Sequence, residues 1–336
     1  MKLATYDNGA RDGCLMLVSR DLTRACAAGI VPTLQAALDH WDEVAPVLEA
    51  DYRALNRGEC DESRPFDPVH CLAPLPRAYQ WADGSAYPHH VESVRRARGV
   101  PMPERYYDDP LLYQGGSDCF LPPLSVLELA DPAWGLDFEA EVAVITSDVA
   151  QGADPAHCAQ AIRLLMLVND WSLRELIPAE LAKGFGFFQG KPACSASPLA
   201  VTPDEAGAAW RDGRLHLPMQ VELNGQRFGH VDAGAGMHFP FPRLLAHAAR
   251  TRRLSAGTVL GGGSVSSPES GSGECCLIER RMRELMEQGA VLTPYLRPGD
   301  RIRIEMLDAG GGSVFGAMEQ LVVASRGAVK SPPANY

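Results

Sequence analysis

Apolar and polar positions alternate along the stretch Leu136 to Ile145, which reads LDFEAEVAVI and is typical of a strand. Because successive side chains of a strand point to opposite faces, Glu139 and Glu141 share one face, whereas Phe138 and Val142 share the other. Two like charges on one face repel each other unless the face is hydrated or a cation lies between them. Taken alone, such a pair is typical of the solvated side of a sheet.

The remaining patterns predict a small leading module followed by a strand-rich region. A strand at 14–19 and helical spacing over 31–48 precede a proline-rich connector, which places a boundary near residue 72. We therefore expect a β-rich α+β protein with a small N-terminal α/β domain at 1–72, a main domain at 73–326 and a flexible tail at 327–336. The other expected elements are extended or turn structure at 83–90, a short basic helix at 91–98, helices at 155–166 and 241–251, and strands at 215–223, 301–306 and 316–323.

Composition narrows the classes of partner. The net charge is −11, from 42 acidic and 31 basic residues, which argues against nucleic acid and suits a cation site. There is no run of about 18 apolar residues and no apolar core of a signal peptide at the N-terminus, so we expect a cytoplasmic protein without a membrane span. The nine cysteines lack the spacing of a zinc site and are expected to be reduced. The adjacent pair Cys275-Cys276 is more typical of packing than of redox chemistry.

Carboxylates and one lysine are the candidates for chemistry. Oxygen ligands of the kind that Mg²⁺ and Ca²⁺ prefer are supplied by Asp83, Glu139, Glu141 and Asp170. The alternative for Asp83, which precedes a glycine, is an ordinary turn. Lys191 lies among phenylalanines, where a lysine is rare unless it is paired, and it is a candidate for neutralising an oxyanion.

The neighbouring residues His89 and His90 add a titratable base near Asp83. If this segment is extended, the two rings face opposite ways and at most one faces a shared site. A single histidine of this kind is more commonly a surface or hydrogen-bonded residue.

Four motifs in fixed order carry a family resemblance. They are Asp-Phe-Glu-Ala-Glu at 137–141, Asn-Asp-Trp-Ser-Leu-Arg at 169–174, Gly-Lys at 190–191 with Ser-Pro at 197–198, and Gly-Ser-Val-Ser-Ser-Pro-Glu at 263–269. Over about residues 72 to 325 the chain thus resembles the fumarylacetoacetate hydrolase family. The resemblance implies a mixed β-sandwich roll and a homodimer.

The resemblance also implies roles for individual residues. The Mg²⁺ or Ca²⁺ ligands would be Asp83, Glu139, Glu141 and Asp170. The catalytic histidine would be His90, seven residues after Asp83, and the glutamate that orients it would be Glu279. Oxyanion-stabilising positions match Arg174 and Lys191, and substrate-contact positions match Tyr113, Arg98 and Ser264.

The implied activity is hydrolysis of a carbon–carbon bond in a 1,3-diketo acid, with fumarylacetoacetate giving fumarate and acetoacetate in aromatic amino acid breakdown. Another reaction of the family is the nearest alternative: acylpyruvate hydrolysis, or decarboxylation, hydration or isomerisation of a 2-oxo acid. A remote alternative is a non-catalytic, cation-stabilised binding domain. Ile177 and Leu181 depart from the family pattern, which has a glutamine and a tyrosine at these positions in the animal enzymes that cleave fumarylacetoacetate.

Overall fold

The computed structural model describes residues 1–97, 99–269 and 271–325. Its helices are α1 (Leu34–Asp39), α2 (Trp41–Arg57), α3 (Pro88–Ala97), α4 (Pro155–Ala161), α5 (Ile177–Leu181), α6 (Phe241–Ala248) and α7 (Leu277–Gln288), with short 3₁₀ turns at Pro68–His70, Pro132–Trp134 and Pro203–Ala209. Its strands are β1 (Lys2–Tyr6), β2 (Cys14–Val18), β3 (Arg24–Ala27), β4 (Arg64–Pro65), β5 (Gln80–Gly84), β6 (Leu112–Gly115), β7 (Leu127–Leu129), β8 (Leu136–Asp137), β9 (Ala140–Thr146), β10 (Ile162–Asn169), β11 (Ser172–Leu173), β12 (Ser195–Ala196), β13 (Leu199–Val201), β14 (Trp210–Arg211), β15 (Arg214–Leu215), β16 (Pro218–Leu223), β17 (Gln226–Asp232), β18 (Thr258–Gly261), β19 (Arg301–Met306) and β20 (Met318–Ala324).

Two sheets form the main body. The larger has the order β4-β3-β2-β1-β13-β10-β9-β18-β5-β6, with β12 also paired to β10, and the smaller has the order β17-β16-β19-β20-β7. In the larger sheet β9 runs antiparallel to β10 and to β18, whereas β18 runs parallel to β5. The fold is therefore a strand-rich mixed α+β structure, as the sequence predicts.

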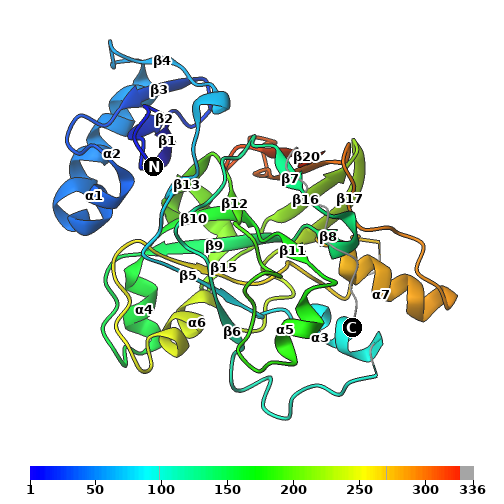
Figure 1. The fold of residues 1–336 in the computed structure, drawn as a ribbon. Helices are drawn as coiled ribbons and strands as arrows, with labels where there is room; N and C mark the ends of the chain where they lie inside the picture. Colours follow the sequence, from blue (N-terminus) through cyan, green and yellow to red (C-terminus); the bar gives the residue numbers. More distant parts are fainter. Residues whose placement is uncertain (98, 270, 326–336) are drawn as a thin grey trace.

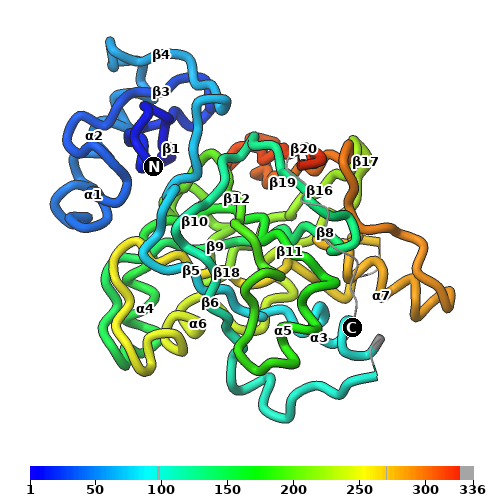
Figure 2. The backbone as a smooth tube through the Cα atoms, viewed as in Figure 1, coloured from blue at the N-terminus to red at the C-terminus, as the bar shows by residue number. Residues whose placement is uncertain are grey.

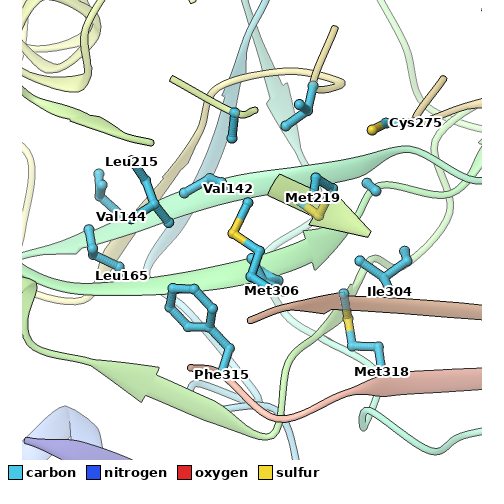
Figure 3. Close-up of a cluster of buried hydrophobic side chains, with 14 of the residues drawn as sticks. Val142, Val144, Leu165, Leu215, Met219, Cys275, Ile304, Met306, Phe315 and Met318 are labelled. Atoms are coloured by element: carbon cyan, nitrogen blue, oxygen red, sulfur yellow. The ribbon is translucent and has the colours of Figure 1, made fainter. Parts of the chain in front are cut away.

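The core between the two sheets is built from alternating strand positions. On β9 and β10 the side chains of Val142, Val144 and Leu165 face those of Met219 and Met306 from the smaller sheet (Figure 3). The intervening positions of β9 belong to a second cluster on the opposite face. Because both faces of β9 and β10 are covered, their sequences read as nearly continuous apolar runs, and a charged residue in this layer needs a specific partner.

The leading residues form a module of four strands and two helices at one end of the molecule (blue in Figure 1). Helix α2 begins with two acidic residues in its first turn and ends at Gly58, whose φ of 76° suits a residue without a Cβ. Strand β1 pairs with β13, so the sheet of the module continues into the larger sheet. From this module the chain runs directly to β5 (Figure 2).

The predicted helix at 155–166 is wrong in its second half. Asp154 caps the N-terminus by accepting a hydrogen bond from the backbone N–H of His157, and the helix ends at Ala161. The following run, IRLLMLVN, forms β10. A short apolar run has the same periodicity in a buried helix and in a buried strand, and here the two covered faces of the sheet decide in favour of the strand.

The extended segment predicted for 83–90 and the helix predicted for 91–98 also need correction. Strand β5 ends at Gly84, and α3 begins already at Pro88, a residue that is well tolerated in the first turn of a helix. Both histidines therefore lie in the first turn of α3, which packs against α7.

The strand predicted at 301–306 is confirmed as β19, and the other predicted elements are present with shifted ends. Helix α6 ends at Ala248 rather than at 251, β20 begins at Met318, and the stretch Leu136 to Ile145 is divided between β8 and β9. Cys275 and Cys276 are both buried. Within the part of the chain that is described, no helix is long and apolar enough to cross a bilayer. The tail predicted at 327–336 lies outside the described residues.

Candidate metal and catalytic site

Neighbouring strands of the larger sheet bring the predicted site residues together. The order β10-β9-β18-β5-β6 places Asp170 directly after β10, Glu141 on β9, Asp83 on β5 and Tyr113 on β6. Asp83 and Tyr113 are register partners, as are Asp83 and Gly261 of β18. Residues distant in sequence thus meet at one end of these strands.

Three of the four predicted ligands form a compact group, which we call the acidic trio: Asp83, Glu141 and Asp170. Each offers a carboxylate oxygen, these oxygens all lie within 4.8 Å of one another, and all three side chains are buried. Burial, followed by the charge of the neighbouring carboxylates, raises the pKa of both Asp83 and Glu141 well above the ordinary value.

The acidic trio lacks sufficient positive charge of its own. Neither side-chain oxygen of Glu141 has a hydrogen-bond partner among the described residues. Asp83 accepts one hydrogen bond at Oδ1, from the backbone N–H of Gly263 at 3.0 Å. A buried carboxylate without partners is unfavourable unless it is protonated or binds a cation. The donor set, which is composed of oxygens, fits Mg²⁺, Mn²⁺ or Ca²⁺.

A glycine keeps space open beside the acidic trio. A Cβ on Gly261 would collide with Asp83 Oδ1 and would lie 3.1 Å from Glu141 Oε2. A larger residue at 261 would therefore occupy the space where two of the three carboxylates converge. This is a second observation that fits a bound ion.

Asp170 is the member of the trio with the most protein contacts. Its Oδ2 accepts hydrogen bonds from the Tyr113 hydroxyl at 2.6 Å and from Lys191 Nζ at 2.7 Å. Its Oδ1 accepts one from the Cys194 thiol at 3.0 Å. These contacts fix the orientation of the carboxylate, and neither Cys194 nor this contact of Tyr113 was anticipated from the sequence.

Glu139, the fourth predicted ligand, lies outside the acidic trio and has two cationic partners. Arg174 donates to Oε1 at 2.5 Å and Lys191 donates to Oε2 at 2.6 Å. Burial opposes its ionisation, but Arg174 and Lys191 outweigh burial and lower the pKa of Glu139. Lys191 bridges Glu139 and Asp170, and the two carboxylates raise the pKa of Lys191 although burial lowers it. A metal-ligand role for Glu139 stays a prediction.

Asp137 is a further part of this network that sequence reasoning did not select. It accepts hydrogen bonds from the backbone N–H groups of Leu277 and Ile278, the first two residues of α7, at 2.6 and 2.9 Å. It also accepts one from Arg174 Nε at 2.8 Å. Asp137 therefore ties the N-terminus of α7, and with it Glu279, to the arginine of the site. Its position two residues before Glu139, on the same strand face, was the available signal.

Glu279 contacts both histidines. His89 Nδ1 lies 2.8 Å from Glu279 Oε1, and His90 Nδ1 lies 3.4 Å from Glu279 Oε2. Ser266 donates to Oε1 at 2.7 Å. Burial opposes ionisation, but these hydrogen bonds lower the pKa of Glu279 to about 2. The extended segment on which opposite-facing rings depended is absent, because both histidines lie in α3. Of the two, His90 lines the cavity that Asp83 also lines.

The cavity at this site has a volume of about 180 Å³ and is lined by both polar and apolar side chains. The polar ones include Asp83, Glu139, Lys191, Arg174, His90, Tyr113 and Ser264. The apolar ones, which we call the apolar wall, are Val91, Val94, Ile177, Leu181, Phe187 and Ile278. The Ser264 hydroxyl has no partner among the described residues. Arg98, the remaining predicted substrate contact, lies outside the described residues.

Comparisons with known proteins agree with this architecture. Residues 1–77 match the model of fumarylacetoacetase N-terminal domain 2, and residues 80–323 match that of the fumarylacetoacetate hydrolase C-terminal domain. None of the curated proteins matches the chain in sequence.

Solved structures share the fold. One is a fumarylacetoacetate hydrolase from Exiguobacterium antarcticum, 18% identical, with a TM-score of 0.65 over 97% of this chain and 100% of that one. Another is maleylpyruvate hydrolase from Sphingobium sp. SYK-6, 15% identical, with a TM-score of 0.64 over 97% and 100%. The same enzyme in complex with manganese(II) and pyruvate is 17% identical in the comparison, with a TM-score of 0.63 and the same coverage. With one family model matching more than two thirds of its length, the chain belongs to the fumarylacetoacetate hydrolase family.

Proposed function

We propose that this protein is a divalent-metal-dependent hydrolase that cleaves a carbon–carbon bond in a 1,3-diketo acid. The observation that carries the proposal is a cavity lined by Asp83 of the acidic trio, by His90, which contacts Glu279, and by the two cations Arg174 and Lys191. Fumarylacetoacetate, which would give fumarate and acetoacetate in aromatic amino acid breakdown, is the first substrate to test.

The acidic trio would hold the ion, with Glu139 as the further predicted ligand. Mg²⁺ and Ca²⁺ were the expected ions, and the manganese(II) complex of maleylpyruvate hydrolase adds Mn²⁺ to those worth testing. When bound, the ion supplies Lewis-acid polarisation of the substrate oxygens and a template for their placement.

His90 is the proposed general base. Glu279, ionised at neutral pH, contacts Nδ1 of the ring and thereby orients it, and the ring accepts a proton from a water molecule. The hydroxide adds to the substrate carbonyl. When the carbon–carbon bond breaks, the departing enolate takes the proton back from His90, so the protons balance.

Lys191 and Arg174 are the proposed donors to the oxyanion of the tetrahedral adduct. Two of the three N–H groups of Lys191 donate to Glu139 and Asp170, which leaves one for the substrate. Both cations are held in place by carboxylates before substrate binds. An oriented donor of this kind contributes about 3 kcal/mol to catalysis.

The assay follows ultraviolet absorbance of fumarylacetoacetate with and without added Mg²⁺, Mn²⁺ or Ca²⁺, with identification of the products. We expect metal-dependent loss of absorbance and a fall in turnover of about 100-fold or more in His90→Ala with unchanged metal affinity. No metal-dependent consumption of any diketo acid would overturn the hydrolase proposal. Equal turnover in His90→Ala would remove His90 from the mechanism.

The apolar wall favours acylpyruvates as a second candidate substrate class. Fumarylacetoacetate carries a second carboxylate at its far end, but Arg174 and Lys191, the Arg and Lys residues on the described wall of the cavity, are both already paired with carboxylates. An uncharged acyl end fits beside Ile177 and Leu181 without an unpaired charge. The ratio of kcat/KM for an acylpyruvate to that for fumarylacetoacetate decides between the two classes. Leu181→Tyr should lower kcat/KM for apolar acylpyruvates. Arg98→Ala tests whether a cation binds the second carboxylate of fumarylacetoacetate.

We also propose a cytoplasmic homodimer. The family resemblance supports the dimer, and the nine unpaired cysteines support a reducing compartment. Analytical ultracentrifugation measures the oligomeric state directly.

A further inference from the structure

Two cysteines far from the cavity lie in direct contact. The thiol of Cys60 lies 2.6 Å from Sγ of Cys26, although the residues are 34 positions apart in the sequence. Cys26 is on β3, and Cys60 is in the turn that follows α2 and leads to β4. Both side chains are only partly buried, so a small oxidant can reach them.

Other contacts hold this turn beside β3 independently of the thiols. Arg24, two residues before Cys26, donates through Nε to the Ser63 hydroxyl at 2.9 Å, and Ser63 donates to the Cys60 carbonyl at 2.6 Å. Strand β4 then pairs with β3, with Ala25 and Arg64 as register partners. The backbone is therefore already arranged with the two sulfurs facing each other.

We propose that Cys26 and Cys60 are a site of oxidative modification, at which a hydroperoxide or a small-molecule disulfide converts the two thiols into a disulfide that fixes the turn after α2 to β3. A disulfide has a sulfur–sulfur distance of about 2.05 Å, so a small movement of the side chains completes the bond. The bond would lie at the outer edge of the larger sheet, at the end of the molecule opposite α3, α5 and α7 (Figure 1).

Hydrogen peroxide would oxidise the two thiols in two steps. The Cys60 sulfur attacks one peroxide oxygen, the oxygen–oxygen bond breaks, and the leaving hydroxide takes the thiol proton to become water. The Cys26 sulfur then attacks the resulting sulfenic acid, and the second hydroxide leaves as water with the Cys26 proton. The peroxide gains the two electrons that the sulfurs lose. Burial, and then the neighbouring Cys60, raise the pKa of the Cys26 thiol to about 12, which keeps Cys26 protonated at neutral pH and disfavours it as the sulfur that attacks the peroxide first.

The remaining cysteines provide controls. Cys119 is exposed but has no thiol partner, and Cys71, Cys158, Cys194, Cys275 and Cys276 are buried. Simple accessibility predicts that Cys119 reacts first, whereas the proposal predicts a specific cross-link between two less accessible thiols.

The test oxidises the reduced, full-length protein with a small excess of hydrogen peroxide and maps peptides under non-reducing conditions. We expect the denatured protein to fall from nine titratable thiols to seven, a Cys26–Cys60 peptide two hydrogens lighter than its parts, and reversal by dithiothreitol. Cys26→Ser and Cys60→Ser should abolish the cross-link, whereas Cys119→Ser should keep it. Oxidation confined to Cys119, or sulfinic acid at Cys60 without the cross-link, would overturn the proposal.

Thermal unfolding tests the proposed effect on the turn. Closing a loop of this length restricts the unfolded chain, so the oxidised wild-type protein should unfold several degrees higher than the reduced protein. The same treatment should leave the midpoint of Cys26→Ser unchanged. A cross-linked protein whose midpoint does not rise would contradict the fixing of the turn.

Discussion

Two groups of buried carboxylates lie side by side in this protein, and their charges are balanced in different ways. In the first, Asp137 and Glu139 surround Arg174, and Lys191 completes the group. We call this the paired group. In the second, the acidic trio, the cationic contact is the one that Lys191 makes with Asp170. The pKa of Glu139 is accordingly lowered, whereas that of Glu141 is raised, although both side chains are buried and the two residues are only two positions apart in the sequence.

The difference shows what the paired group does for the trio. Arg174 and Lys191 are used to neutralise Glu139 and Asp137, so little positive charge remains for Asp83 and Glu141. A protein interior tolerates such a deficit when an external cation supplies the missing charge. The paired group thus holds the two proposed oxyanion donors in place, and the trio would be available to the proposed metal ion.

The largest expected effect is a loss of metal affinity when a member of the acidic trio is replaced. Glu141→Gln removes a carboxylate that has no protein partner, so we expect affinity for Mn²⁺ and Mg²⁺ to fall more than about 100-fold. Isothermal titration calorimetry measures it, with the exposed Glu222→Gln on β16 as the matched control. Unchanged affinity in Glu141→Gln would show that the trio is not the metal site.

In the presence of a chelator, substitutions in the two groups should change the free energy of unfolding in opposite directions. Glu139→Gln leaves Arg174 and Lys191 without their shared carboxylate, and breaking a buried pair in this way lowers the free energy of unfolding by about 3–5 kcal/mol. Glu141→Gln removes like-charge repulsion, so the free energy of unfolding should rise by about 1–2 kcal/mol. Denaturant midpoints in EDTA provide the comparison. A change of the same sign in both variants would remove the distinction between the groups.

A smaller effect on metal affinity is expected when the space beside the acidic trio is filled. A methyl group on Gly261 would meet Asp83 Oδ1 and would lie 2.5 Å from Cη2 of the buried Trp81, so Gly261→Ala should weaken Mn²⁺ binding by about tenfold. In Gly262→Ala the new methyl group meets side-chain carbons of Met237 and Phe241 at 3.2 and 3.4 Å. This neighbouring variant should bind Mn²⁺ within about twofold of wild type. Equal loss in both variants would indicate general distortion of the loop.

The sequence predicts which residues converge but not how their charges are shared. Strand alternation places Glu139 and Glu141 on one face, and the family motifs select Asp83 and Asp170. Periodicity does not reveal that Lys191 bridges Glu139 and Asp170, because that contact joins a loop to a strand end 52 and 21 residues away. The division into two groups depends on such long-range contacts.

Long-range contacts also account for one of two errors in secondary structure. The run after Ala161 is apolar at every position that a helix would also bury, and its pairing with β9, β12 and β13 makes it a strand. The segment at 83–90 was expected to be extended, whereas Pro88 begins α3 and gives both histidines access to Glu279. Tertiary packing, which the local pattern does not encode, decided the first case, whereas Pro88 was a local signal for the second.

The smallest expected effect concerns pH and Glu279, a carboxylate outside both groups whose partners include the two histidines. Its pKa is about 2 in the folded protein against about 4.5 in an unfolded chain, so its contribution to stability is complete above about pH 4.5 and is lost as the pH falls toward 2. The pKa of His89 is raised, chiefly by its hydrogen bond to Glu279, so its contribution is complete below about pH 6.5 and is lost as the pH rises through the folded value.

The two contributions overlap between about pH 4.5 and 6.5, where the contact should stabilise the protein most. In EDTA, the difference in unfolding free energy between wild type and Glu279→Gln should therefore be greatest near pH 5.5 and should shrink on both sides. Glu222→Gln, exposed on β16, should show no such maximum. A difference that stays constant from pH 4 to 8 would mean that Glu279, unlike Glu139, owes nothing to the charge of its partners, and that charge pairing in this site is confined to Arg174 and Lys191.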